Sequence, residues 1–100
     1  MPRARLHVLV VDDDPSLREA LEAALASEYI VHTAATGDEA CALLSAHPVS
    51  AIILDAILKK EYGLDLVERF RALSPAPIAL LTGHGSEKLA MGQRRYGGGI

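Results

Sequence analysis

Polar side chains follow three apolar segments of this sequence at the point where each segment ends. They are Asp12 and Asp13 after Leu6–Val11, Asp55 after Ala51–Leu54, and Thr82 after Ile78–Leu81. Three carboxylates held close together repel one another, and a hard divalent cation such as Mg²⁺ would remove that repulsion. A carboxylate beside such a cation can attack a phosphoryl group and form an acyl phosphate, and Thr82 could donate its hydroxyl to a phosphoryl oxygen. These residue types therefore indicate magnesium-assisted phosphoryl chemistry, provided that they meet at one site.

The order of apolar and amphipathic segments predicts how those residues are positioned. Short apolar segments typical of buried strands alternate with segments whose apolar residues recur at helical spacing. The expected strands are Leu6–Val11, Ile30–Ala34, Ala51–Leu54 and Ile78–Leu81. The expected helices run from Asp14-Pro15 to about Ser27, from the capping box Thr36-Gly37-Asp38-Glu39 to Pro48, from Leu66 to Leu73 and, more weakly, from Glu87 to Arg95. This alternation predicts an α/β fold, with a parallel sheet covered by helices on both faces.

The carboxyl ends of the strands in such a sheet lie at one edge, where open α/β proteins bind their ligands. A single aspartate after a strand is usually a turn or cap residue. Three strands that each run into a polar residue favour a shared pocket instead. Asp14 is different, because it directly precedes Pro15 and is interpreted as the N-cap of the first helix.

The composition limits the chain to one domain and argues against several functions. A length of 100 residues predicts a single domain over residues 1–100. The net charge of −3 argues against contact with nucleic acid or with an anionic membrane surface. The longest unbroken apolar run, Ala40–Leu44, is too short to cross a bilayer, and the single cysteine, Cys41, fits a reducing compartment. We therefore expect a cytoplasmic location.

Four motifs of the chain together resemble the receiver domain of two-component response regulators. They are Val10-Val11-Asp12-Asp13-Asp14-Pro15, the lone Asp55 after a strand, Gly63-Leu64 eight and nine residues later, and Leu81-Thr82-Gly83-His84-Gly85. The resemblance covers nearly the whole chain. It implies a flavodoxin-like, doubly wound parallel sheet, whose strand order in the family is 2-1-3-4-5.

The resemblance also implies a role for each candidate residue. Asp55 corresponds to the phosphoacceptor, and Thr82 to the residue that senses the phosphoryl group. Asp13 and Asp55, with the backbone carbonyl of Ile57, would bind Mg²⁺, and Asp12 would act mostly through water. The chain would then be a regulatory domain rather than an enzyme, and would take its phosphoryl group from a sensor histidine kinase or a phosphotransfer protein.

The sequence departs from the family pattern at three places. Lys59 stands where a proline is usual, and Tyr62 stands where an aspartate is common. The chain ends at Gly97–Ile100, before the fifth strand with its Lys-Pro pair and before the last helix. We therefore predict a C-terminally truncated receiver of strand order 2-1-3-4, marginally stable and mobile from Thr82 onward. Its open edge at Ile78–Leu81 favours self-association, and an effector domain could follow in the parent protein.

Two other functions stay open on the sequence alone. Without the family's lysine, the chain could be a pseudo-receiver, which is never phosphorylated and acts only as a protein-binding module. The run Asp12-Asp13-Asp14 also fits loosely the nucleophile motif of a haloacid-dehalogenase-type phosphatase. That second interpretation leaves Asp55 unexplained.

Overall fold

The computed structural model describes residues 4–56, 58 and 61–81, and these contain four strands and three helices. In chain order the elements are β1 (Leu6–Val11), α1 (Pro15–Leu25), β2 (Tyr29–Ala34), α2 (Gly37–Ala46), β3 (Val49–Asp55), α3 (Gly63–Leu73) and β4 (Ile78–Leu81). The four predicted strands and the first three predicted helices are confirmed. The fourth predicted helix, Glu87 to Arg95, lies outside the described residues.

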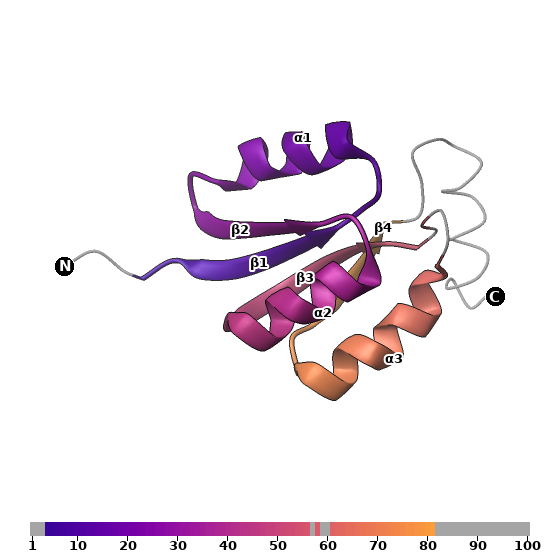
Figure 1. Ribbon diagram of the computed structural model, residues 1–100. Helices are drawn as coiled ribbons and strands as arrows, with labels where there is room; N and C mark the ends of the chain where they lie inside the picture. The colour runs from indigo at the N-terminus through magenta and orange to yellow at the C-terminus, as the bar shows by residue number, and fades with distance from the viewer. Residues whose placement is uncertain (1–3, 57, 59–60, 82–100) are drawn as a thin grey trace, which may run out of the picture.

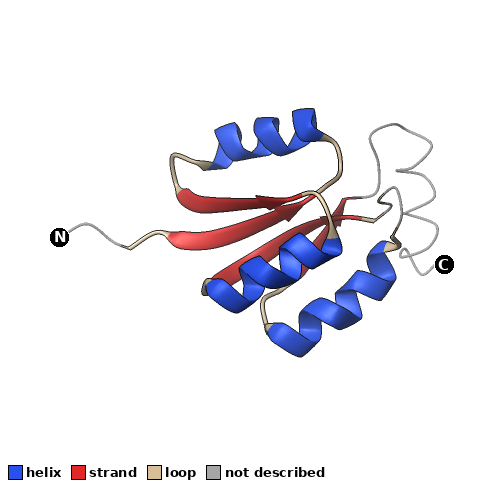
Figure 2. Ribbon diagram, in the orientation of Figure 1, coloured by secondary structure: helices blue, strands red, loops and turns tan. Residues whose placement is uncertain are grey.

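The strands form one parallel sheet in the order β2-β1-β3-β4. Helix α1 covers one face of this sheet, and helices α2 and α3 cover the other (Figures 1 and 2). The predicted doubly wound α/β fold and the strand order 2-1-3-4 are therefore confirmed. Within the described ranges β4 is an edge strand, because it pairs there only with β3. None of the helices in these ranges has the length and apolar character needed to span a bilayer.

The bounds of several elements differ from those expected by one to three residues, and the largest difference is at α3, which begins at Gly63, three residues before the predicted Leu66. Helix α1 ends at Leu25, two residues before Ser27. The N–H of the next residue, Ala26, donates the last hydrogen bond of the helix to the carbonyl oxygen of Glu22. Strand β3 begins two residues before the predicted Ala51 and ends one residue after Leu54. The longer β3 includes Asp55 in the sheet, so the backbone of that residue is held by strand pairing.

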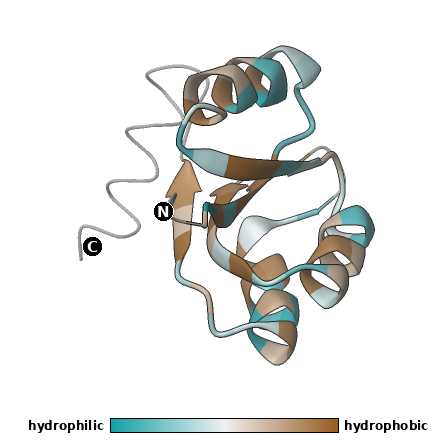
Figure 3. Cartoon of the chain, turned by 90° about the vertical axis from the view of Figure 1, so that its left-hand side faces the viewer, coloured by the Kyte–Doolittle hydropathy of each residue, from teal (hydrophilic) through white to brown (hydrophobic). Residues whose placement is uncertain are grey.

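The main core lies between the sheet and helices α2 and α3. Leu9 and Val11 of β1 and Ile52 and Leu54 of β3 are fully buried there, and the fully buried Phe70 of α3 belongs to the same cluster. Burying each of these side chains contributes about 1.5–3 kcal/mol. Figure 3 shows the same division, with mostly apolar strands inside and helices that carry both apolar and polar segments. The two central strands are thus firmly held up to the edge where they end.

Side-chain caps fix where α1 and α2 begin. Asp14 accepts a hydrogen bond from the backbone N–H of Ser16 at 2.9 Å, which confirms its interpretation as an N-cap. Thr36 accepts one from the N–H of Glu39 at 3.2 Å. The predicted capping box differs in one detail, because the Glu39 carboxylate accepts from the N–H of Ala35 at 2.8 Å and not from that of Thr36.

Gly63, the first residue of α3, lies against the backbone of the segment that follows β3. Its N–H donates a hydrogen bond to the carbonyl oxygen of Ala56 at 2.9 Å. A Cβ atom at Gly63 would lie 2.8 Å from both the Cα atom and the carbonyl oxygen of Ala56, so the backbone would have to move. The glycine therefore lets α3 begin directly beside the residue after Asp55.

We predict that Gly63→Ala lowers the free energy of unfolding by about 1–3 kcal/mol, because the added methyl group collides with backbone atoms. Glu68→Ala, at an exposed position of the same helix, is the matched control, because it brings no atom toward the backbone of Ala56 and should therefore cost less. Urea unfolding of both variants and the parent chain measures the difference. An equal loss in the two variants would contradict the role assigned to the Ala56 contact.

Candidate functional site

Three carboxylates meet at the carboxyl ends of β1 and β3. Asp12 and Asp13 follow the last residue of β1, and Asp55 is the last residue of β3. Because Val11 is in register with Leu54 on the neighbouring parallel strand, the residues that come next lie side by side. One carboxylate oxygen from each aspartate lies within 4.8 Å of the others. The structure thus brings together the three acidic candidates of the sequence, whose roles as ligands and nucleophile stay predictions.

The two other candidate residues, Ile57 and Thr82, lie outside the described residues, as does Lys59. Their predicted roles therefore stay predictions as well.

Burial makes the acidic cluster costly. Asp12 and Asp55 are fully buried, and Asp13 is partly exposed. Two ionised carboxylates about 5 Å apart repel each other by roughly 3 kcal/mol at an effective dielectric constant of about 20. That is a large fraction of the stability of a small domain, and a cation bound among the oxygens would offset it.

The backbone around Asp12 is held by three hydrogen bonds. Its N–H donates to the carbonyl oxygen of Ala34 at 3.0 Å, which continues the pairing of β1 with β2. Its side-chain Oδ1 accepts from the N–H of Asp14 at 2.8 Å, and its carbonyl oxygen accepts from Nη1 of Arg18 at 2.7 Å. The loop between β1 and α1 therefore fixes the Asp12 side chain. It also places the positively charged guanidinium of Arg18 beside the acidic edge.

The segment after Asp55 turns back onto the end of β3. The N–H of Ala56 donates to the carbonyl oxygen of Leu81 at 2.9 Å, which joins the ends of β3 and β4. Leu58 is buried in the core, and its N–H donates to the carbonyl oxygen of Glu61 at 3.1 Å. With the Gly63 bond to Ala56, these contacts give Asp55 a closely packed surrounding.

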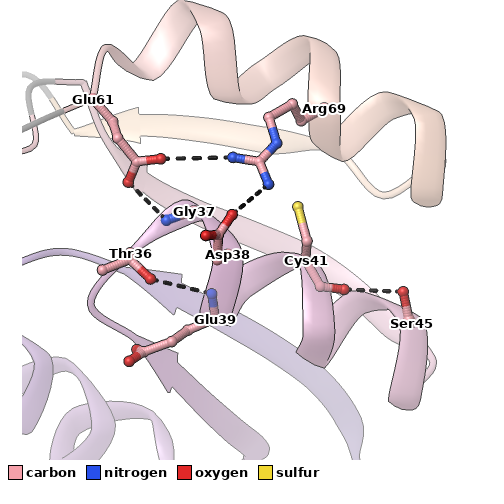
Figure 4. A network of polar contacts seen from close by, with 8 residues as sticks. All are labelled: Thr36, Gly37, Asp38, Glu39, Cys41, Ser45, Glu61 and Arg69. Atoms are coloured by element: carbon pink, nitrogen blue, oxygen red, sulfur yellow. Dashed lines mark hydrogen bonds and ion pairs between the residues drawn. The ribbon is translucent and has the colours of Figure 1, made fainter.

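Glu61 links that segment to the start of α2 (Figure 4). Its Oε1 accepts a hydrogen bond from the N–H of Gly37 at 2.9 Å, and its Oε2 lies 3.6 Å from Nη1 of Arg69 on α3. Nη2 of Arg69 lies 2.8 Å from Oδ1 of Asp38, and this hydrogen bond is the main cause that raises the pKa of Arg69 above its ordinary value. A carboxylate at a helix N-terminus also interacts favourably with the helix dipole. The network therefore ties α2, α3 and the segment after β3 together.

Sequence reasoning missed Arg18, Glu61 and Arg69. The position of Arg18, one turn after the cap residue Asp14, was a usable local signal, because the first turn of that helix faces the end of β1. Glu61 and its partner Gly37 are 24 residues apart, and no local pattern joins them. Such a contact becomes visible only when the packing of α3 against α2 is known.

The fold and the acidic edge define a doubly wound α/β domain with a cluster of carboxylates where its central strands end. The family model of the response regulator receiver domain matches residues 8–98. The chain belongs to this family, and the resemblance inferred from its four motifs is confirmed.

Known relatives agree with this assignment. The transcriptional regulatory protein AruR of Pseudomonas aeruginosa is 43% identical over 86 residues, which cover 80% of this chain and 35% of that protein. The chemotaxis protein CheY4 of Vibrio cholerae has a similar structure, with 33% identity, a TM-score of 0.75 and coverage of 90% of this chain and 79% of that one. A response regulator from Burkholderia pseudomallei, solved with a phosphorylated aspartic acid, calcium ion and citrate, has 30% identity, a TM-score of 0.74 and coverage of 87% and 55%. The chain spans about a third or less of the length of the curated relatives it matches.

We predict that Glu61→Ala lowers the free energy of unfolding by about 1–2 kcal/mol, because the buried Gly37 loses the acceptor of its N–H. Asp38→Ala is the matched control. This change removes the other acidic partner of Arg69. Because the Asp38 side chain is 90% exposed, its loss should lower the free energy of unfolding by less. Urea unfolding of both variants checks the order. A larger loss in Asp38→Ala than in Glu61→Ala would show that the exposed ion pair, and not the bond to α2, holds the network.

Proposed function

We propose that Asp55 of this receiver domain accepts a phosphoryl group in a two-component phosphorelay. The observation that carries the proposal is the meeting of the buried Asp55 carboxylate with those of Asp12 and Asp13 at one edge of the sheet. A carboxylate nucleophile beside further hard oxygen ligands is what an acyl phosphate site with a divalent cation requires. The phosphorylated aspartic acid in the related Burkholderia pseudomallei protein supports the same chemistry here.

In the proposed step, a carboxylate oxygen of Asp55 attacks the phosphorus atom of the donor. The new oxygen–phosphorus bond forms as the bond from phosphorus to the leaving group breaks, and the leaving group keeps the electron pair of that bond. It departs as acetate when acetyl phosphate is the donor, and as an imidazole when the donor is a phosphohistidine. Catalysis of such transfers is mainly positioning and charge neutralisation. The hydrogen bonds of Ala56 and Gly63 would supply the positioning.

The three aspartates fit a magnesium ion. Carboxylate oxygens are the ligands that Mg²⁺ prefers, at about 2.1 Å, so two octahedral ligand atoms lie about 3–4 Å apart. The oxygens of the cluster are within 4.8 Å of one another, which needs only small side-chain adjustments. Asp13 and Asp55, with the carbonyl of Ile57, would hold the ion, and Asp12 would act mostly through water. When bound, the ion would offset negative charge on the phosphoryl oxygens.

The proposed partners follow from the family. A sensor histidine kinase or a phosphotransfer protein would supply the phosphoryl group in the cytoplasm, and Thr82 would sense it on Asp55. An effector domain in the parent protein would carry the output, as the match to about a third of a transcriptional regulatory protein suggests. Self-association through the edge of β4, predicted from the sequence, stays a prediction.

We predict that acetyl phosphate with Mg²⁺ adds one phosphoryl group to the chain and that Asp55→Asn abolishes the addition, because the amide is not a nucleophile. Intact-protein mass spectrometry measures the added mass. Asp14→Asn is the control, since asparagine also caps a helix and should leave labelling intact.

Two results would contradict this assignment. A folded chain that binds Mg²⁺ but is never labelled would be a pseudo-receiver. Labelling that survives Asp55→Asn but is lost in Asp12→Asn would identify Asp12 as the nucleophile, as in a phosphatase.

We predict that Mg²⁺ stabilises the chain, by about 1.4 kcal/mol at a concentration ten times its Kd. Asp13→Asn should raise the stability of the metal-free protein, because it removes one repelling charge, and should reduce the response to Mg²⁺. Thermal unfolding with and without Mg²⁺ measures both effects, and Asp14→Asn should keep the full response. Identical melting temperatures of the parent chain with and without saturating Mg²⁺ would count against the site.

A further inference from the structure

Three histidines from three different elements form a second cluster of ligand groups. His7 lies on β1, His32 lies on β2, and His47 follows the last residue of α2. One ring nitrogen from each lies within 4.8 Å of the others, and all three side chains are partly buried. No part of the proposed phosphoryl chemistry uses them.

The strand geometry explains why the three rings meet. His7 and Leu9 are two residues apart on β1, so they point to the same face of the sheet. His32 and Ala34 are related in the same way on β2. Both Leu9 and Ala34 belong to the core under α2. His47 is the C-cap of that helix, so the end of α2 brings the third ring onto the same face.

This cluster is separate from the acidic edge. His7 is the second residue of β1, and Asp12 follows the last one, so Asp12 lies five residue steps further along the extended chain. At about 3.3 Å per residue this is a distance of roughly 16 Å along the strand. A ligand of the histidines would therefore not contact the carboxylates.

The rings are close and mutually stacked. His7 Nδ1 lies 2.9 Å from His32 Nε2, and the ring centroids of His32 and His47 are 4.1 Å apart. Burial is the main cause that lowers the pKa of His32, and the charges of His47 and then His7 lower it further.

We propose that His7, His32 and His47 form a binding site for a divalent transition metal ion of the Zn²⁺ class. Imidazole nitrogen suits such ions, and three histidines with a water in the fourth position are a known zinc environment. Bonds of about 2.0–2.1 Å at tetrahedral angles separate two ligand atoms by about 3.3 Å. The nitrogens lie within 4.8 Å of one another, and to bind one ion the stacked rings would have to turn about χ2, a broad torsion in histidine, so that the nitrogens point at a common centre.

The bound ion would join β1, β2 and the end of α2. The folded chain, in which the three rings are brought together, would bind the ion more tightly than the unfolded chain, so the ion would stabilise the fold by mass action. This proposal does not depend on the phosphoryl function, and either one can fail without the other.

Titration of the full 100-residue chain with ZnCl₂ in the presence of excess MgCl₂ tests the proposal. Imidazole C–H signals in the NMR spectrum report each histidine in the native protein. We expect the signals of His7, His32 and His47 to shift together with a 1:1 stoichiometry, and those of His84 to stay in place. Shifts confined to His84 or to aspartate neighbours, or no saturation below millimolar Zn²⁺, would overturn the proposal.

Matched variants locate the site independently. We expect His47→Gln to weaken Zn²⁺ binding more than about tenfold in calorimetry, and His84→Gln to change it less than about twofold. Asp13→Asn should also change it less than about twofold, which separates this site from the acidic edge. His47 ends a helix, and circular dichroism checks that its variant stays folded. Unchanged affinity in His47→Gln, or an equal loss in Asp13→Asn, would overturn the proposal.

Discussion

The pairing of β1 with β3 is the interaction on which the acidic site depends. It places Asp12 beside Asp55 although two ionised carboxylates at that distance repel each other by a few kcal/mol. The strands hold this arrangement because their side chains, such as Leu9 and Ile52, are fully buried just before the edge. Hydrophobic burial in the middle of the sheet therefore holds the carboxylates close together at its end. A cation that binds there would offset the repulsion between them.

The surroundings of Asp55 depend on long-range contacts rather than on local propensity. Helix α3 begins at Tyr62-Gly63 without a side-chain cap, because the N-cap residue Tyr62 makes no such hydrogen bond. Its start is held instead by the close approach of Gly63 to Ala56 and by the link from Glu61 to α2. The family's frequent aspartate at the position of Tyr62 would have provided a local cap. In this chain, tertiary contacts fix the start of α3 instead of a side-chain cap.

The local sequence was sufficient to predict the elements, two of the caps and the edge at which the acidic residues gather. Those features depend on short-range patterns, such as Asp14-Pro15 before a helix, or on the general geometry of parallel sheets. The capping detail at Ala35, the Glu61 link and the histidine cluster were not predicted. Each of them depends on which face of one element packs against another, and His7 in particular stood inside a run that the sequence presented simply as a buried strand.

The two clusters of polar side chains follow from one property of the central strand. Residues of β1 alternate between the faces of the sheet, and those that face α2 begin with His7, continue through Leu9 and end with Val11 before Asp12. The apolar middle of this series separates a cluster of imidazole ligands at the start of the strand from a cluster of carboxylate ligands after its end. Because imidazole nitrogen and carboxylate oxygen prefer different cations, the two proposed sites at the ends of this strand would differ in the ion that each binds best.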